Sequence, residues 1–207
     1  MALVDYAATR AAPRHLPDMR RADRAHLFLG VRRFLPKVPR GLTMALHEQS
    51  VGATDEWYTP PHVFDALGCS FDVDVASPGA AVVPWIPAAA HITTNSLTSP
   101  CWRGFVWMNP PFGARNGLVP WLERFFQHGN GIALVPDRTS APWWQKYAVN
   151  AEWLLFVSPK LKFIGADGQP GESPAQGTTL MAVGRQGREA LQRATANELG
   201  VLVTPWP

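Results

Sequence analysis

The segment Gly104-Phe105-Val106-Trp107-Met108-Asn109-Pro110-Pro111-Phe112 decides the fold, because it predicts a buried strand that ends in a rigid turn. Its first part, Gly104–Met108, is almost entirely apolar, as expected for a strand that is covered on both faces. The turn begins at Asn109, directly after the strand, and so lies at the carboxyl edge of the predicted sheet. Ligands of open α/β folds bind at that edge.

Strand and helix patterns alternate along the chain from about Asp55. The first helix is expected to use Thr59 as its N-cap and Pro60 as its first residue. The alternation predicts an α/β domain with a mostly parallel sheet and helices on both faces. The expected strands are Phe71–Val75, Gly104–Met108, Gly131–Val135, Trp153–Val157, Thr178–Val183 and an edge strand at Val201–Thr204; the expected helices are Pro60–Leu67, Val119–His128, Pro142–Asn150 and Arg188–Leu199.

Residues 1–46 differ from the rest of the chain in charge. They hold nine basic and three acidic residues, a net charge of +6, whereas the other 161 residues hold ten basic and thirteen acidic ones, a net charge of −3. Scattered arginines and interrupting prolines predict a basic, disordered N-terminal arm, followed by one folded domain at 47–207. The arm either binds nucleic-acid phosphates or is a dispensable tail.

Composition excludes several classes of protein. No run of 18 or more apolar residues is present, so no transmembrane helix is expected. Two cysteines, Cys69 and Cys101, are too few for a disulfide framework or a four-cysteine zinc site. The six histidines show no metal-ligand spacing, so no metal is expected.

The turn Asn109–Phe112 has the chemistry to hold a planar amine. Two prolines fix the backbone and remove two N–H donors, so the turn presents carbonyl oxygens without competing donors. Asn109 adds a side-chain acceptor, and Phe112 adds a flat apolar face. Acceptors on both N–H bonds of the adenine amino group favour a tetrahedral nitrogen and stabilise its developing positive charge. The alternative is a plain turn, because Asn-Pro and Pro-Pro are common in loops.

Four segments, in order, resemble the phage-type DNA adenine-N6 methyltransferase (Dam) family over about Thr54–Gly184. Each matches a motif of that family, and the four together are more specific than Asn-Pro-Pro-Phe alone. The segments are Asp55-Glu56-Trp57-Tyr58-Thr59-Pro60; Phe71-Asp72-Val73-Asp74-Val75-Ala76-Ser77; Asn95-Ser96-Leu97 with Trp102 and Asn109–Phe112; and Leu134-Val135-Pro136-Asp137-Arg138-Thr139 with Trp143-Trp144.

The resemblance implies a Rossmann-like methyltransferase fold and S-adenosyl-L-methionine as the methyl donor. The residues it assigns to catalysis are Asn109, Pro110, Pro111 and Phe112, and those it assigns to the cofactor are Thr59, Pro60, Asp74, Ala76, Ser77 and Asn95. Two features of the family's wider class are missing: a Gly-rich fingerprint, and an acid on a second strand for the ribose hydroxyls.

Three of the cofactor residues also have a plainer interpretation. Thr59 is consistent with a simple N-cap. Asp74 is equally suited to a salt bridge or to capping a helix, and Asn95 to closing a turn. The residue types alone leave both roles open.

DNA is the partner that the resemblance implies, and the target base must leave the duplex to be reached. The expected nucleic-acid contacts are Arg115, Arg138, Trp144, Lys160 and Lys162. Arg138 is equally suited to an ion pair with Asp137, and Trp144 to the core. The loops Gly113–Leu118 and Gly165–Gly177 are expected to read the target, and the second is expected to be mobile.

The resulting function is transfer of a methyl group to the N6 amino group of adenine in DNA, in the cytoplasm of a bacterial or phage-infected cell. One alternative keeps the reaction but takes RNA or a protein amide as the acceptor. Another is a catalytically degenerate phage module that binds nucleic acid. A cytosine-C5 reaction through Pro100-Cys101 is disfavoured, because Cys101 precedes the strand and no partner glutamate motif is found.

Overall fold

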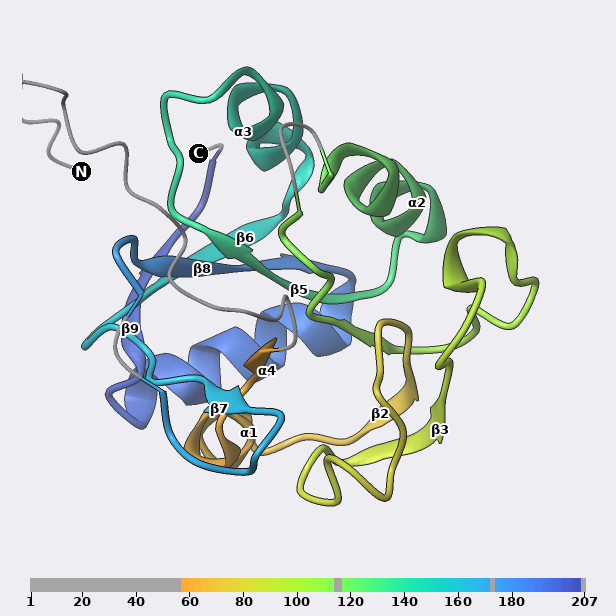
Figure 1. The fold of residues 1–207 in the computed structure, drawn as a ribbon. Coiled ribbons are helices and arrows are strands. Elements are labelled where there is room, and N and C mark those ends of the chain that lie inside the picture. The colour runs from red at the N-terminus through yellow and green to blue at the C-terminus, as the bar shows by residue number, and fades with distance from the viewer. Residues whose placement is uncertain (1–56, 114–116, 172–173, 206–207) are drawn as a thin grey trace, which may run out of the picture. The chain divides into compact units, whose positions relative to one another are not determined.

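A computed structural model describes residues 57–113, 117–171 and 174–205 (Figure 1). The predicted arm, residues 1–46, lies outside the described residues, and so does Arg115.

A sheet of seven strands forms the centre of the domain, in the order β3-β2-β4-β5-β8-β6-β9. A separate pair of short strands, β1 and β7, runs antiparallel. The strands are β1 Trp57–Tyr58, β2 Phe71–Asp74, β3 Ala88–His91, β4 Val106–Met108, β5 Gly131–Pro136, β6 Trp153–Val157, β7 Ile164–Gly165, β8 Thr178–Val183 and β9 Gly200–Val203. The helices are α1 Pro61–Leu67, α2 Val119–His128, α3 Pro142–Tyr147 and α4 Arg185–Ala196, with short 3₁₀ turns η1 Ser96–Thr98 and η2 Ala148–Asn150.

The sheet is mixed, which corrects the expectation of a mostly parallel one. Strands β3, β2, β4 and β5 are parallel to one another, whereas β8 is antiparallel to both β5 and β6, and β9 is antiparallel to β6. The described residues of the connection from β6 to β8 form β7 and loops but no crossover helix, and β8 returns in the opposite direction.

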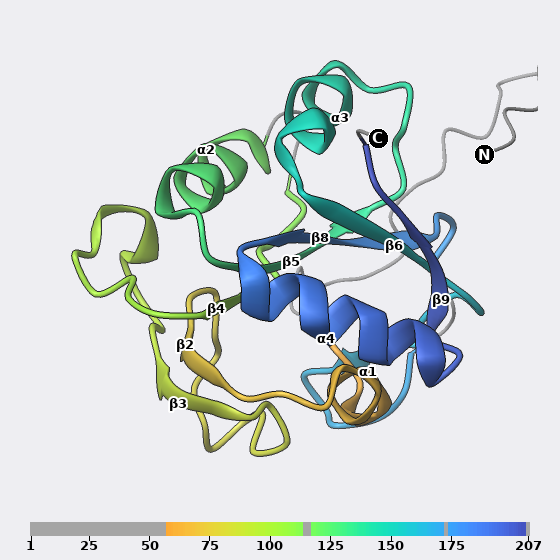
Figure 2. The same ribbon diagram turned by 180° about the vertical axis from the view of Figure 1, so that it is seen from behind.

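Helices cover both faces of the sheet, as predicted. Figure 2 shows α1 and α4 on one side and α2 and α3 on the other. Successive residues of β4 point to opposite faces of the sheet and so enter different hydrophobic cores. Trp107 packs in the core that holds Phe64 of α1, and Met108 packs in the core that holds Leu122 of α2. The sheet therefore separates two hydrophobic cores and is accessible at its edges.

Three predicted elements, α2, β6 and β8, have the bounds that the sequence indicated. Helix α1 differs at its start: Pro60 is the N-cap, in an extended conformation, and no side chain caps the helix. Proline disfavours the helical conformation in the residue before it, so Pro61 keeps Pro60 extended and the helix begins one residue later. The expectation that Thr59 is the N-cap is therefore wrong.

A glycine at the start of β5 is required by the close approach of β4. An ideal Cβ on Gly131 would lie 2.6 Å from the carbonyl oxygen of Val106. We predict that Gly131→Ala lowers the free energy of unfolding by about 1–3 kcal/mol, as overpacked sites do, measured by urea denaturation. Gly168→Asn is the control, because a Cβ there meets nothing within 4 Å and asparagine tolerates its positive φ. Equal stability of the two variants would contradict the prediction.

Candidate functional site

The carboxyl ends of three parallel strands meet at one edge of the sheet. Asp74 ends β2, Asn109 follows β4, and Asp137 follows β5. The register places Asp74 beside Trp107 and Met108 beside Ala133, so β2 and β4 end close together, whereas β5 continues to Pro136 before Asp137 follows. The strand order thus gathers the Asn109 turn and Asp74 at the edge where α/β folds bind ligands.

The turn that follows β4 begins with Asn109, whose side-chain amide makes a hydrogen bond through its nitrogen only. Asn109 is half-buried, and its Nδ2 donates a hydrogen bond of 3.0 Å to the carbonyl oxygen of Trp57. No hydrogen bond to Oδ1 is formed within the described part of the chain. Pro110 is buried and Pro111 is exposed, and neither has an N–H to donate. The turn therefore keeps a free acceptor oxygen beside a donor-poor backbone.

Phe112 ends the turn against a second aromatic ring. The Phe112 ring is half-buried and meets Phe163 edge-on, with ring centroids 6.5 Å apart and an interplanar angle of 88°. Edge-to-face pairs of this kind are favoured by the quadrupoles of the rings. The contact fixes the position of Phe112 relative to the loop that precedes β7.

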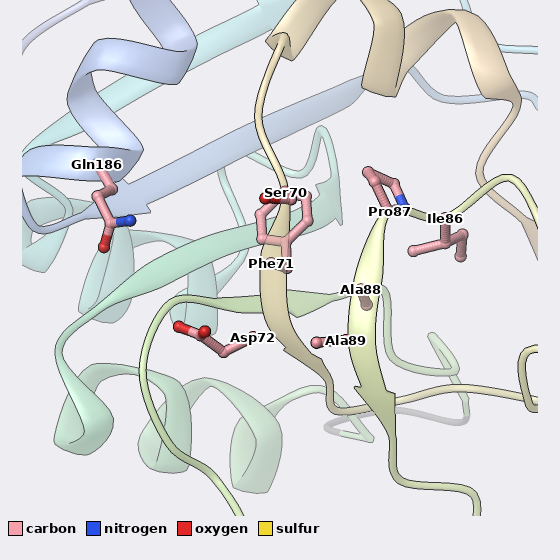
Figure 3. A pocket seen from close by; sticks show the side chains of 8 residues that line it. All are labelled: Ser70, Phe71, Asp72, Ile86, Pro87, Ala88, Ala89 and Gln186. Atoms are coloured by element: carbon pink, nitrogen blue, oxygen red, sulfur yellow. The ribbon is translucent and has the colours of Figure 1, made fainter.

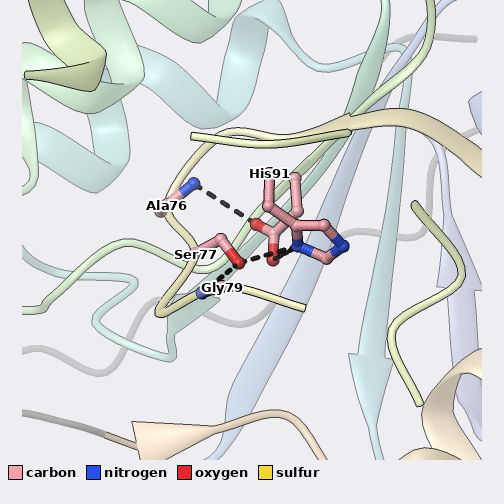
Figure 4. A network of polar contacts seen from close by, with 5 residues as sticks. Ala76, Ser77, Gly79 and His91 are labelled. Atoms are coloured by element: carbon pink, nitrogen blue, oxygen red, sulfur yellow. Dashed lines mark hydrogen bonds and ion pairs between the residues drawn. The ribbon is translucent and has the colours of Figure 1, made fainter. Parts of the chain in front are cut away.

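Asp74 is 1% exposed and is the centre of a polar network. The backbone N–H of Ala76 donates to Asp74 Oδ1 over 3.3 Å, and His91 Nδ1 lies 3.6 Å from Asp74 Oδ2. Ser77 Oγ lies 2.8 Å from His91 Nδ1 and accepts from the N–H of Gly79 over 3.1 Å (Figure 4). Burial raises the pKa of Asp74, while the hydrogen bonds of Ser77 and Ala76 and the nearby His91 oppose that rise.

Thr59 and Asn95 have different surroundings. Thr59 is fully buried, and its Oγ1 has no hydrogen-bond partner within the described residues, while its carbonyl accepts from Trp85 Nε1 over 2.9 Å. Asn95 is exposed, has a φ of 52°, and its carbonyl accepts from the N–H and the hydroxyl of Thr98. Thr59 therefore has an unsatisfied group to offer a ligand, whereas the contacts of Asn95 are those of a turn.

The expected nucleic-acid residues divide into two groups. Arg138 Nε donates to Gln176 Oε1 over 2.7 Å, and Lys160 Nζ donates to the carbonyl of Ala175 over 2.5 Å, so both cations lie against the segment that leads into β8. Lys162 is also exposed.

Trp144 is different, because it is 4% exposed, stacks on Phe156 and meets Trp143 edge-on. It is a packing residue in this structure.

Three groups that contact the candidate site residues were not predicted from the sequence. They are the carbonyl of Trp57, the side chain of Phe163 and the imidazole of His91. His91 ends the strand Ala88-Ala89-Ala90-His91, which lacks the alternation of a half-buried strand. Phe163 lies in the run Leu161-Lys162-Phe163, whose alternation of apolar and charged residues indicates that Phe163 is buried.

A shallow recess elsewhere on the domain does not belong to this site. It is lined by Ser70, Phe71 and Asp72 before and in β2, by the start of β3, and by Gln186 of α4 (Figure 3). These residues lie at the amino end of β2, opposite Asp74.

The described residues contain neither a membrane-spanning helix nor a cluster of metal ligands. None of their helices is long and apolar enough to cross a membrane. No three of their His, Cys, Asp and Glu side chains come together as a metal site would require.

The fold is an α/β domain that brings a buried carboxylate and a donor-poor aromatic turn to one edge of its sheet. The chain belongs to the DNA N-6-adenine-methyltransferase (Dam) family, whose model matches residues 48–197. This match confirms the family that the four sequence segments indicated, and it supports a DNA adenine methyltransferase at the level of the family. Searches of curated proteins and of solved structures found no match.

The buried carboxylate of Asp74 predicts a pH-dependent stability. Because its pKa is raised in the folded state above the ordinary value of 3.8, the folded protein binds the proton more tightly than the unfolded chain does. The free energy of unfolding should therefore fall as pH rises from about 4 through the folded pKa. Asp74→Asn removes this titration, so its stability relative to wild type should increase between pH 4 and pH 7 in urea denaturation.

Asp65→Asn is the matched control, because it removes one exposed carboxylate from α1. Its stability relative to wild type should change little over the same range. An Asp74→Asn curve parallel to that of wild type at every pH would contradict the prediction. His91 Nδ1 lies 3.6 Å from Asp74 Oδ2, so the comparison is repeated in a His91→Gln background.

Proposed function

We propose that the chain transfers a methyl group from S-adenosyl-L-methionine to the N6 amino group of adenine in DNA. The observation that carries the proposal is the Asn109 turn: a free side-chain acceptor, a backbone without competing donors and an aromatic ring, at the same sheet edge as a buried carboxylate. The family match supports DNA as the substrate class.

The residues around Asp74 and Thr59 fit the cofactor. A buried carboxylate with a raised pKa gains from a cationic partner, and the amino group of the cofactor is one. The unpartnered hydroxyl of Thr59 would find a hydrogen bond in the same ligand. Asp74, Ala76 and Ser77 together with Thr59 and Pro60 would therefore hold it, and Asn95 is the weakest of the expected contacts. When bound, the cofactor supplies an electrophilic methyl group on its sulfonium.

The Asn109 turn would bind and orient the acceptor. Asn109 Oδ1 and the carbonyl of Pro110 accept the two N–H bonds of the adenine amine, and Phe112 stacks on the base. These acceptors favour a tetrahedral nitrogen with its lone pair directed at the methyl group, and they stabilise the positive charge that develops there. No side chain has to remove a proton before the nitrogen attacks.

The decisive variant is Asn109→Ala, assayed by transfer of a labelled methyl group from S-adenosyl-L-methionine to unmethylated DNA. We predict a fall in kcat of at least 100-fold, because removing one preorganised group that stabilises transition-state charge has an effect of that order. Cofactor affinity by calorimetry should be unchanged, since Asn109 does not belong to the Asp74 network. Full activity of the variant would overturn the mechanism.

Two other functions remain as alternatives, and each is separated from the proposal by its own measurement. RNA or a protein amide also fits an Asn-Pro-Pro-aromatic turn, and competition between the three acceptors identifies the substrate. A module that binds nucleic acid without catalysis would show no cofactor binding by calorimetry.

Arg138, Lys160 and Lys162 would supply contacts to DNA phosphates. We predict that the double variant Arg138→Gln/Lys160→Gln raises the KM for DNA with little change in kcat. It should also reduce the slope of log affinity against log salt by about one for each charge that contacts a phosphate. Arg185→Gln is the control, because α4 starts at the opposite edge of the sheet and its ion pair with Glu189 is exposed. Equal effects of the two would refute this interface.

A further inference from the structure

The orientation of the Asn109 amide is set by a backbone group far away in the sequence. An amide side chain offers two donors on nitrogen and two lone pairs on oxygen, and exchanging the two ends reverses what it presents to a ligand. In this structure Nδ2 faces the carbonyl oxygen of Trp57 at 3.0 Å, which leaves Oδ1 to the site. An exchanged amide would bring two oxygen acceptors together and lose the hydrogen bond.

Trp57 presents that carbonyl because of how β1 pairs with β7. In the hairpin that contains β7, Gly165 N donates to Gln169 O over 2.9 Å and Gly171 N donates to Phe163 O over 2.7 Å. Backbone groups of successive residues point to opposite sides of a strand, so the N–H and C=O of Ile164 face β1.

The same alternation applies to β1 itself. Its register places Tyr58 opposite Ile164, so the carbonyl of Trp57 points away from β7, toward Asn109. Asn109 therefore caps the free edge of a short strand whose other edge is held by the hairpin.

Side chains of this hairpin reinforce the same link. The ring of Trp57 lies over Gly171, where an added Cβ would come within 2.5 Å of it. Phe163, directly before β7, holds the Phe112 ring edge-on. Trp57 of β1 thus contacts the Asn109 amide, and Phe163 of the hairpin contacts the Phe112 ring.

We propose that Trp57 is a positioning residue for Asn109. The antiparallel pair of β1 and β7, here called the β1–β7 ribbon, fixes the Asn109 amide so that its oxygen faces the substrate amine. The inference rests on the proposed function, since it assumes that Asn109 Oδ1 accepts a hydrogen bond from that amine. A shift of even about 1 Å in such a group is enough to slow a reaction on the order of 100-fold. The ribbon therefore acts on kcat without touching the substrate.

The first test breaks the ribbon with proline in the full chain. Ile164→Pro removes the N–H that faces β1, and we expect kcat to fall 10- to 100-fold while the cofactor Kd stays within twofold of wild type. Ala166→Pro is the matched control, because Ala166 is the second residue of a turn closed by Gly168 N and Gly165 O, a position that favours proline. Ile164→Ala controls for the lost side chain and keeps the N–H. All variants are compared at saturating DNA, because Ala166 lies in the loop expected to read the target, and both controls should then retain kcat within about twofold.

The second test observes the amide directly and does not depend on activity. In protein labelled with ¹⁵N-asparagine, the side-chain NH₂ signals of Asn109 are those that disappear in Asn109→Asp. We expect one of its two protons to be shifted downfield and slow to exchange in wild type and Ala166→Pro, and to resemble a free amide in Ile164→Pro. If Ile164→Pro does not fold, the wild-type spectrum still decides, because free-amide signals there would overturn the inference.

The third test separates the inference from the proposed function. Asn109→Asp keeps an acceptor oxygen but loses the donor, and its carboxylate faces the Trp57 carbonyl. If the ribbon positions the amide, this variant should lose at least tenfold in kcat; activity within twofold of wild type would show that the donor end has no role. Full activity of Asn109→Ala would instead refute the proposed function itself. Equal losses in Ile164→Pro and Ala166→Pro would overturn the ribbon alone.

Discussion

Burial of β4 on both faces is the constraint on which the rest of the site depends. Trp107 fills the core under α1 and α4, while Val106 and Met108 fill the core under α2 and α3. A strand covered in this way has no free face, so the polar turn at Asn109 lies at the edge of the sheet. The parallel neighbour β2 ends beside it, which brings Asp74 to the same edge, and β5 ends at that edge three residues further along.

The edge carries groups that stability alone would not favour. Asp74 is a carboxylate in a nearly dry position, and its raised pKa expresses the cost of keeping it charged there. The hydroxyl of Thr59 is buried without a partner in the described residues. Costs of this kind gather where a fold is adapted to bind something, because a ligand supplies the missing partner. The apolar strands behind the edge provide the stability that offsets them.

The sequence predicted most elements because their apolar periodicity is strong. Helix α2 and strands β6 and β8 have clear patterns and keep their predicted bounds. The mixed sheet was not predicted, because the direction of β8 depends on how the chain connects it to β6. A strand that is covered on both faces has the same residue pattern in either direction. The two-residue strands β1 and β7 are too short for any periodicity to show.

What the sequence determined by itself was local: an apolar strand, a turn made rigid by two prolines, and the order of four motifs that places the chain in its family. Only the tertiary structure decided that Trp144 packs in the core and that His91 lies next to Asp74. It also decided the orientation of the Asn109 amide. The last of these depends on a backbone carbonyl 52 residues away along the chain. Every residue has such a carbonyl, so its position leaves no signature in the side chains and exists only once the strands are paired.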